Sequence, residues 1–115
     1  MKILVAVHDL MFTSKINSVI KGHEVTWLPR GSSVADQVKE LKPEVLVIDL
    51  GNANLKPAEA IAAIKADPAT TQVHVIGYVG HTEEAIIASV KAAGCDEIYS
   101  KGEFARRLPE LLAVK

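Results

Sequence analysis

The sequence predicts a three-layer α/β sandwich, in which helices cover both faces of a five-stranded parallel sheet. Five short apolar runs rich in valine and isoleucine occur along the chain, and continuous runs of this kind are typical of strands buried on both faces. Stretches with apolar residues at helical spacing separate these runs in strict alternation. Strands joined by helices run parallel, and right-handed crossovers place the helices on both faces of the sheet.

The first part of the chain predicts two strands and the helix between them. Ile3 to Val7 is the first buried run, and Val25 to Leu28 is the second. Gly22 occupies the position of a helix C-cap glycine. The helix before this glycine is indicated by four apolar residues at helical spacing, namely Phe12, Ile16, Val19 and Ile20.

The middle of the chain predicts a second helix and a third strand. Ser33 and Asp36 resemble a capping box, with Asp36 in the place of the usual Glu or Gln. The helix ends at Lys42-Pro43, because the residue before a proline is biased away from the helical region. Val45 to Ile48 then forms the third strand, and Asp49 lies at its carboxyl end.

A loop, a third helix and a fourth strand follow. Gly51, Asn52 and Asn54 indicate the loop, and Pro57 fits the first turn of a helix that runs to about Ala66. Residues 73–79 predict the fourth strand.

The last part of the chain predicts two helices around a short fifth strand. Thr82 is expected to cap the fourth helix, Gly94 ends it, and Glu97 to Tyr99 form the strand. The final helix carries Phe104, Leu108, Leu111 and Leu112. Pro109 lies inside this pattern, so a kink or a late helix start is expected there.

These elements match a flavodoxin-like fold with strand order 2-1-3-4-5. Ligands on such a sheet bind at the carboxyl ends of the strands, around the switch point between the first and third strands. The prediction places His8, Asp9, Asp49, the Gly80-His81 corner and Lys101 at this rim.

Length and composition narrow the class of protein. The 115 residues predict a single domain, 1–115, that is 49% hydrophobic and 23% charged, with a net charge of -1. The absence of a basic excess argues against nucleic-acid binding, and the apolar runs are too short to cross a membrane. A single cysteine and no signal-peptide pattern indicate a cytoplasmic protein.

Several stretches resemble the receiver domain of bacterial two-component response regulators. They are MKILVAV, KGHEV, PEVLVIDL, VHVIGYVGHTEE and KAAGCDEIYSKGEF, so the resemblance covers nearly the whole chain. It places Asp49 at the phosphoacceptor position and Lys101 at the position of the lysine that contacts the phosphoryl group. DLMFTSKI and IYSKGEFARRLPELL also resemble a group of short, standalone receiver-like bacterial proteins.

The chain departs from the receiver pattern at four positions. Val7 and His8 replace the acidic pair that binds Mg2+ in receivers, and valine offers none of the oxygen ligands that Mg2+ requires. Val79 replaces the hydroxyl residue that ends the fourth strand, and Ile98 replaces the aromatic residue of the fifth. The resemblance therefore implies an atypical receiver without ordinary Mg-dependent phosphorylation switching. A working phosphoacceptor receiver that uses Asp49 is the alternative.

The rim residues have other interpretations. Asp49 and Lys101 can form a structural ion pair, which we favour. His8, Asp9 and Asp49 offer imidazole and carboxylate ligands for a transition metal. The simpler interpretation is that Asp9 caps the first helix and that His8 is a half-exposed rim residue. The sequence therefore predicts neither a metal site nor a cofactor.

Other classes of protein fit the sequence less well. A cobalamin-binding domain would share the architecture and the His8-Asp9 pair, but Ala6 and Met11 replace the Asp and Gly of its cobalt-ligating motif. The loop HDLMFTSK is too bulky for the phosphate loop of a flavodoxin. Cys95 is expected to be a small buried thiol, so no nucleophile-and-base arrangement supports an enzyme.

The resemblance also implies a protein partner. In receivers, the face made by the fourth helix, the fifth strand and the fifth helix commonly contacts partners or a second copy of the domain. In this chain the face extends from Glu83 to Leu112 and includes Tyr99 and Phe104. We therefore expect a protein partner, with a homodimer through this face as one form.

Overall fold

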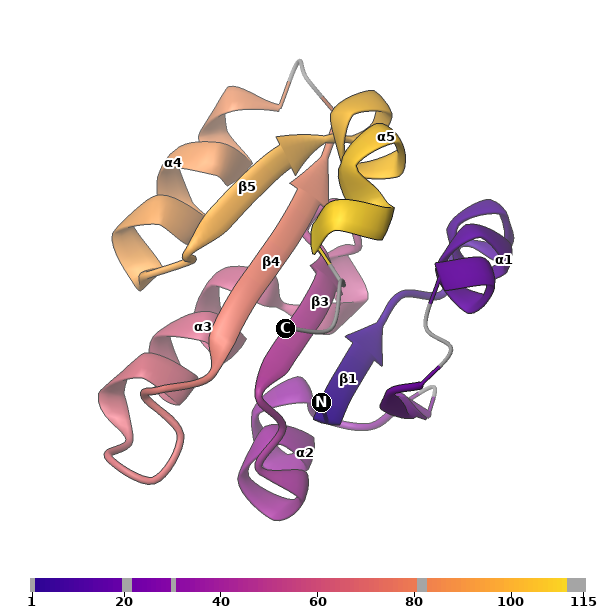
Figure 1. Ribbon diagram of the computed structural model, residues 1–115. Helices are drawn as coiled ribbons and strands as arrows, with labels where there is room; N and C mark the ends of the chain where they lie inside the picture. Colours follow the sequence, from indigo (N-terminus) through magenta and orange to yellow (C-terminus); the bar gives the residue numbers. More distant parts are fainter. Residues whose placement is uncertain (1, 20–21, 30, 81–82, 112–115) are drawn as a thin grey trace.

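A computed structural model describes residues 2–19, 22–29, 31–80 and 83–111 and confirms the predicted fold (Figure 1). The sheet is parallel, with strand order β2-β1-β3-β4-β5. The elements are β1 (Lys2–Ala6), α1 (Leu10–Val19), β2 (Glu24–Trp27), α2 (Val34–Leu41), β3 (Val45–Asp49), the 3-10 helix η1 (Ala53–Leu55), α3 (Pro57–Ala66), β4 (His74–Val79), α4 (Glu84–Ala93), β5 (Glu97–Ser100) and α5 (Lys101–Leu111).

Two hydrophobic clusters fill the two spaces between the sheet and its helices. α2, α3 and α4 cover one face, and α1 and α5 cover the other (Figure 1). Side chains alternate between the faces along each strand, so Leu46 and Ile48 belong to the first cluster and Val47 to the second. Both faces are buried, which explains why the central strands are continuous apolar runs.

Three aromatic rings fasten α1 and α5 to β4. The Tyr78 ring stacks on Phe104, with centroids 4.7 Å apart, and lies 4.5 Å from the ring of Phe12. All three residues are buried. Aromatic pairs at such distances contribute about 0.5–1.5 kcal/mol beyond their burial, so this cluster holds the second helical layer in place.

The helix ends follow the sequence signals. The Ser33 side chain accepts a hydrogen bond from the Asp36 amide at 3.3 Å, which confirms the N-cap of α2. Gly94 ends α4 in the left-handed region, with φ of 105°. Lys42 ends α2 in the same region, at φ of 49°, although lysine is rarely found there. Pro57 begins α3 as predicted.

Some local predictions need correction. Residues 53–55 form a 3-10 turn inside the expected loop. α5 begins directly at Lys101, so a late start is wrong. Pro109 is tolerated inside α5, where it lies exposed in the last turn and removes only one backbone donor. Ile20, His81, Thr82 and Leu112 lie outside the described residues.

Two further side chains on or beside the sheet are half-buried. Trp27 lies on the edge strand β2 and packs against the second cluster. Cys95 is half-buried rather than fully buried, and burial raises the pKa of its thiol to about 11. Within the described residues, no helix combines the length and the apolar character that a bilayer-spanning segment needs.

Candidate functional site

The carboxyl ends of the strands bring together a cluster of charged residues, here called the carboxyl-edge site: Asp9, Asp49, Glu83 and Lys101. Asp49 is the last residue of β3, Lys101 follows β5 directly, and Asp9 follows β1. Asp9 and Lys101 both lie close enough to Asp49 to change the pKa of its carboxyl group. Asp9, Asp49 and Lys101 of the predicted rim therefore lie near one another in the folded chain.

The Asp49 carboxylate is partly removed from water. Burial raises its pKa above the ordinary value, and the nearby Asp9 carboxylate raises it further. A hydrogen bond from the Gly51 amide, 3.0 Å from Oδ1, and the positive charge of Lys101 act in the opposite direction without cancelling the effect. Asp49 is thus a half-buried acid whose negative charge is only partly compensated.

The structural ion pair predicted between Asp49 and Lys101 is not formed directly. The Lys101 side chain is exposed, and among the described residues its ammonium group makes no ion pair within 4.0 Å of the Asp49 carboxylate. Lys101 begins α5 and influences Asp49 through longer-range attraction. It is therefore free to approach an additional negative group at this edge.

Glu83 is a member of the site that the sequence analysis did not assign to it. A methyl group built on Gly51 would lie 3.4 Å from Asp49 Oδ1 and also 3.4 Å from Glu83 Oε2. The two carboxylates therefore face the same point in space. Glu83 directly precedes α4, at the positive end of the helix dipole. Only the tertiary structure places it against the β3–α3 loop.

The two positions of the missing acidic pair offer little to a magnesium ion. Val7 is buried and apolar. The His8 Nε2 atom lies 3.0 Å from the Leu28 carbonyl oxygen, to which it donates a hydrogen bond. No group of three or more His, Cys, Asp and Glu side chains within the described part of the chain is arranged to hold a metal ion. The residues present do not fit the usual receiver metal site.

A buried hydroxyl group lies beside Asp49. Tyr78 pairs with Asp49 in the β3–β4 register, and its side chain is fully buried. Burial and the Asp49 and Asp9 charges raise the pKa of Tyr78 far above its usual range. The hydroxyl and the carboxylate influence each other, but their geometry falls outside that of a hydrogen bond, and Tyr78 Oη has no partner among the described residues.

The two positions that would carry a phosphorylation signal are packed with aliphatic side chains. Val79 is buried at the end of β4, and Ile98 is half-buried on β5. Both pack in the cluster under α2, α3 and α4. Valine has no hydrogen-bond donor and isoleucine has no aromatic ring, so neither can make the contacts that these positions make in receivers.

The predicted partner face needs one correction. Phe104 is fully buried against Tyr78 and Phe12, so its ring belongs to the core. Its spacing with Leu108 marks the inner side of α5, because both lie on one helical stripe. Tyr99 is half-buried, donates a hydrogen bond to Glu97 and carries the Arg107 guanidinium 5.5 Å from its ring centre.

A second polar cluster, the amino-edge network, lies at the opposite ends of β4 and β5: Lys65, His74, Asp96 and Glu97. Lys65 Nζ donates to Asp96 Oδ2 at 2.8 Å and to the Val73 carbonyl at 2.7 Å. Asp96 Oδ2 also accepts from the Val75 amide at 2.8 Å, and His74 hydrogen-bonds Glu97. The sequence analysis assigned His74 no role. The cluster was missed because its members come from distant segments.

Comparison with known proteins identifies the fold. Neither a family model nor a curated protein matches the sequence. Among solved structures, a response regulator from Hahella chejuensis is similar at a TM-score of 0.84 and 16% identity, over 96% of this chain and 91% of that one.

Two further solved structures are similar. One is the receiver domain of the sensor histidine kinase PA1611 from Pseudomonas aeruginosa PAO1, with magnesium coordinated in its active-site cleft. It is similar at a TM-score of 0.79 and 17% identity, over 96% of this chain and 92% of that one. The other is the response regulator domain of Thermotoga maritima CheB, at a TM-score of 0.72 and 21% identity, over 97% of this chain and 92% of that one. The chain therefore has the fold of a response-regulator receiver domain.

Proposed function

We propose that this chain is a receiver-like regulatory module that acts by binding a protein partner, without Mg-dependent phosphorylation switching. The observation that carries the proposal is the aliphatic packing of Val79 and Ile98. A ligand shifts a conformational equilibrium only through its different affinities for two states. With no hydroxyl and no ring at these positions, a phosphoryl group at Asp49 has no contact through which to select an alternative state.

Binding of the metal is also disfavoured. Mg2+ keeps a near-octahedral shell of oxygen ligands, whereas Val7 supplies none and His8 Nε2 is engaged with Leu28. Without that metal, only Lys101 would compensate the charge of a phosphoryl group on Asp49. Asp49 then serves as a partly desolvated surface carboxylate rather than as a phosphoacceptor.

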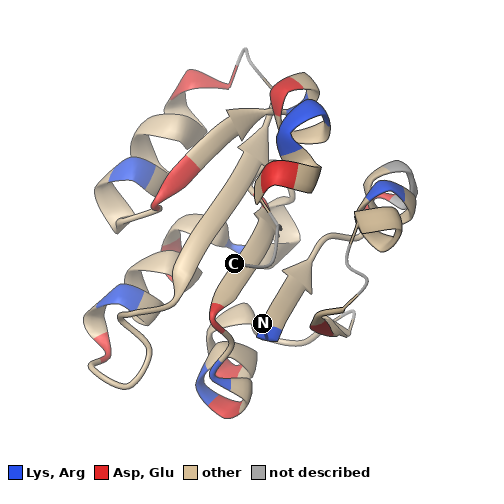
Figure 2. Ribbon diagram, in the orientation of Figure 1, with Lys and Arg blue, Asp and Glu red and all other residues tan. Residues whose placement is uncertain are grey.

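The face formed by α4, β5 and α5 is our candidate for partner binding. Figure 2 shows acidic and basic residues interspersed over these elements. On α5, Glu103 pairs with Arg106 and Arg107 within the helix, each at 3.5 Å. A face of mixed charge suits an isologous contact, in which the same surface of a second copy brings each charge against its opposite. A homodimer is thus one form of the proposed interaction.

Sedimentation velocity over a range of concentrations tests the homodimer. We expect the wild-type protein to dimerise and Arg107→Glu to remain monomeric, because the reversed charge opposes its own copy across a twofold axis. Lys39→Glu, an exposed charge reversal on α2, is the control and should leave dimerisation unchanged. A wild-type protein that is monomeric throughout would leave a different partner protein as the remaining form.

A phosphoacceptor role for Asp49 is the second candidate. The carboxylates of Asp9 and Glu83 favour it, because both bring oxygen atoms near Asp49, although among the described residues the three carboxylates are not arranged to hold a metal ion. Lys101 remains exposed beside them.

A titration by nuclear magnetic resonance distinguishes the two candidates. Millimolar Mg2+ with beryllofluoride is added to the wild-type protein and to Asp49→Asn, and amide shifts are followed. The proposal expects changes only in residues next to Asp49. Changes that extend to Tyr99 and Arg107 in the wild type but are absent from Asp49→Asn would overturn it and establish the phosphoacceptor role. A coloured purified protein would instead indicate a cobalamin-type domain.

A further inference from the structure

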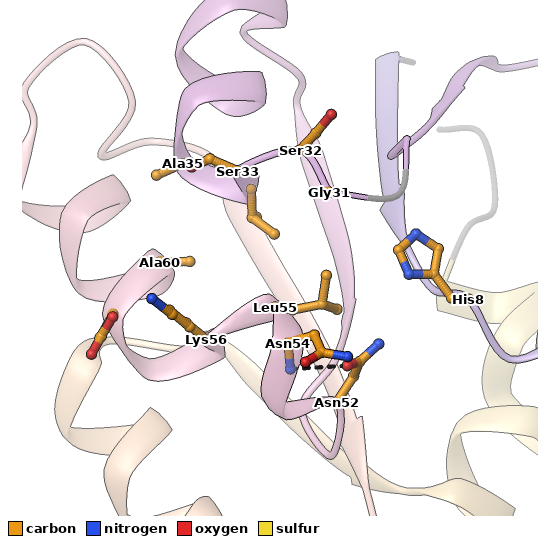
Figure 3. Close-up of a pocket in the computed structure, with 12 residues that line it drawn as sticks. His8, Gly31, Ser32, Ser33, Ala35, Asn52, Asn54, Leu55, Lys56 and Ala60 are labelled. Atoms are coloured by element: carbon orange, nitrogen blue, oxygen red, sulfur yellow. Dashed lines mark hydrogen bonds between the residues drawn. The ribbon is translucent and has the colours of Figure 1, made fainter.

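A cavity separate from the Asp49 carboxylate opens at the same edge of the sheet. Its volume is about 610 Å³, and its walls come from three segments that follow β1, β2 and β3: His8, residues 31–35 and six residues between Asn52 and Ala60 (Figure 3). Small-molecule sites in proteins are commonly about 300–1,000 Å³. In open parallel sheets, ligands bind outside the carboxyl ends at the switch point, here between β1 and β3. Both its size and its position are those of a ligand site.

The cavity has an apolar floor and walls rich in hydrogen-bond donors. Val34, Leu55 and Ala60 are buried at its base. Ser32 and Ser33 line one side of the cavity, and Asn52 and Asn54 line another (Figure 3). Ser33 Oγ and Asn52 Oδ1 already accept backbone hydrogen bonds, so their donor hydrogens remain for a ligand.

Lys56 supplies the positive charge of the cavity. Figure 3 shows it on the wall opposite His8. Its ammonium group makes no ion pair with any described residue, although Glu59 lines the same cavity. Its backbone has φ of 47°, a conformation that glycine or asparagine adopts at lower cost.

We propose that this cavity binds a small polar metabolite through one oxyanion group, a phosphate monoester or a carboxylate. Hydroxyl, amide and ammonium donors recognise oxyanions, and a single lysine with one nearby Glu59 carboxylate suits one anionic group better than a polyphosphate. Within the described residues, His8 carries the only ring that lines the cavity and no Phe, Tyr or Trp does, so oxyanion contacts rather than stacking are the basis of recognition. The hydroxyl and amide groups then contact a polar body such as a polyol.

Three probes that share a six-carbon polyol body test the chemistry: glucose 6-phosphate, gluconate and glucose. Each is titrated into the protein while amide shifts are followed. We expect glucose 6-phosphate or gluconate to bind, with shifts at residues 32–35 and 52–56, and glucose to bind at least tenfold more weakly. The stronger of the two anions identifies the oxyanion as a phosphate or a carboxylate. Binding of none of the three, or equal binding of all three, would overturn the proposal.

Two lysines in the same backbone conformation give a matched pair of variants. Lys56→Gly and Lys42→Gly each replace a lysine with a left-handed backbone at a helix cap. The cavity borders the start of α2, whereas Lys42 lies at the end of that helix. Loss of a charge-assisted contact should weaken oxyanion binding by roughly tenfold or more in Lys56→Gly. Lys42→Gly and Lys56→Arg should bind the oxyanion as tightly as the wild-type protein does. Equal weakening in both glycine variants, or none in Lys56→Gly, would contradict the assignment. This result is independent of phosphorylation at Asp49.

Discussion

The two ends of the sheet shift the pKa values of their carboxylic acids in opposite directions. In the amino-edge network, Asp96 accepts hydrogen bonds from Lys65 and from the Val75 amide, and Glu97 from His74 and Tyr99. Burial by itself would raise the pKa of Asp96 and Glu97, but these bonds outweigh it and hold both values below the ordinary range. At the carboxyl-edge site, burial dominates and raises the pKa of Asp49.

This contrast distinguishes a structural polar cluster from a candidate functional one. A carboxylate that is fully hydrogen-bonded stabilises the fold, because leaving its partners unsatisfied would be costly. A desolvated acid beside other acids and an unpartnered Tyr78 hydroxyl does not stabilise the fold, and perturbed acids of this kind cluster at sites of function. The difference between the two edges can be measured.

The largest effect is expected at the amino edge. Asp96→Ala removes the acceptor of both Lys65 Nζ and the Val75 amide. We expect the free energy of unfolding to fall by about 2 kcal/mol, since a half-buried ammonium and an amide lose a charged partner. Urea denaturation measures the change. Glu24→Ala removes a carboxylate that is 74% exposed and 3.9 Å from Lys2, so it should change stability by less than about 0.5 kcal/mol. An equal loss of stability in Asp96→Ala and Glu24→Ala would contradict a special stabilising role for the amino-edge network.

Acid should destabilise the protein through the amino edge. The folded-state pKa values of Asp96 and Glu97 are depressed, so their contribution is present above the unfolded values and is lost as pH falls through the folded ones. Asp49 has a raised value and acts in the opposite sense, gaining stability as pH falls toward 3.8. Thermal unfolding from pH 7 to pH 2 should show a decline below about pH 4 that is shallower in Asp96→Ala. An unchanged decline in that variant would assign acid sensitivity elsewhere.

A smaller effect of opposite sign is expected beside Asp49. Tyr78→Phe removes a buried hydroxyl that has no hydrogen-bond partner among the described residues, and it keeps the stacked ring. The free energy of unfolding should rise by up to about 1 kcal/mol, because no desolvated polar group remains. Tyr99→Phe is the matched variant at the other edge, where the hydroxyl donates to Glu97, and it should lose stability. A destabilised Tyr78→Phe would show that Tyr78 is hydrogen-bonded in solution.

The smallest effect is expected for Asp49 itself. Asp49→Asn keeps an acceptor for the Gly51 amide while removing a disfavoured charge near Asp9. Stability at pH 7 should increase by less than about 1 kcal/mol, and the gain should diminish as pH falls through the raised folded-state pKa of Asp49. Asp36→Asn, at the exposed first turn of α2, should give no such gain. A loss of stability in Asp49→Asn would mean that Lys101 compensates the Asp49 charge fully.

The elements of the fold follow from local patterns in the sequence. The run Val45–Ile48, the Ser33 cap and Pro57 each act over a few residues, and the structure places the corresponding element ends within about one residue of the prediction. Pro109 was harder to interpret. Its effect depends on whether the lost backbone bond falls in a helix interior or in an exposed last turn, and packing decides that.

The candidate site was only partly predictable. The rule that parallel strands present their carboxyl ends at one edge was enough to place Asp9, Asp49 and Lys101 together. It could not show that Glu83 faces Asp49 across Gly51, or that the Tyr78 hydroxyl lies unpartnered beside it. Phe104 was assigned to the partner face because the resemblance implied that face, although its helical spacing with Leu108 indicates the buried stripe of α5.

By itself, the sequence determined the alternation of strands and helices, the strand order and the edge at which the charged residues gather. These depend on periodicity, caps and the handedness of crossovers, which are properties of short segments. Only the tertiary structure decided the state of each charge. Whether a carboxylate is desolvated, as in Asp49, or hydrogen-bonded, as in Asp96, depends on atoms that distant parts of the chain bring within a few ångströms. The free lysine of the cavity, Lys56, became visible for the same reason.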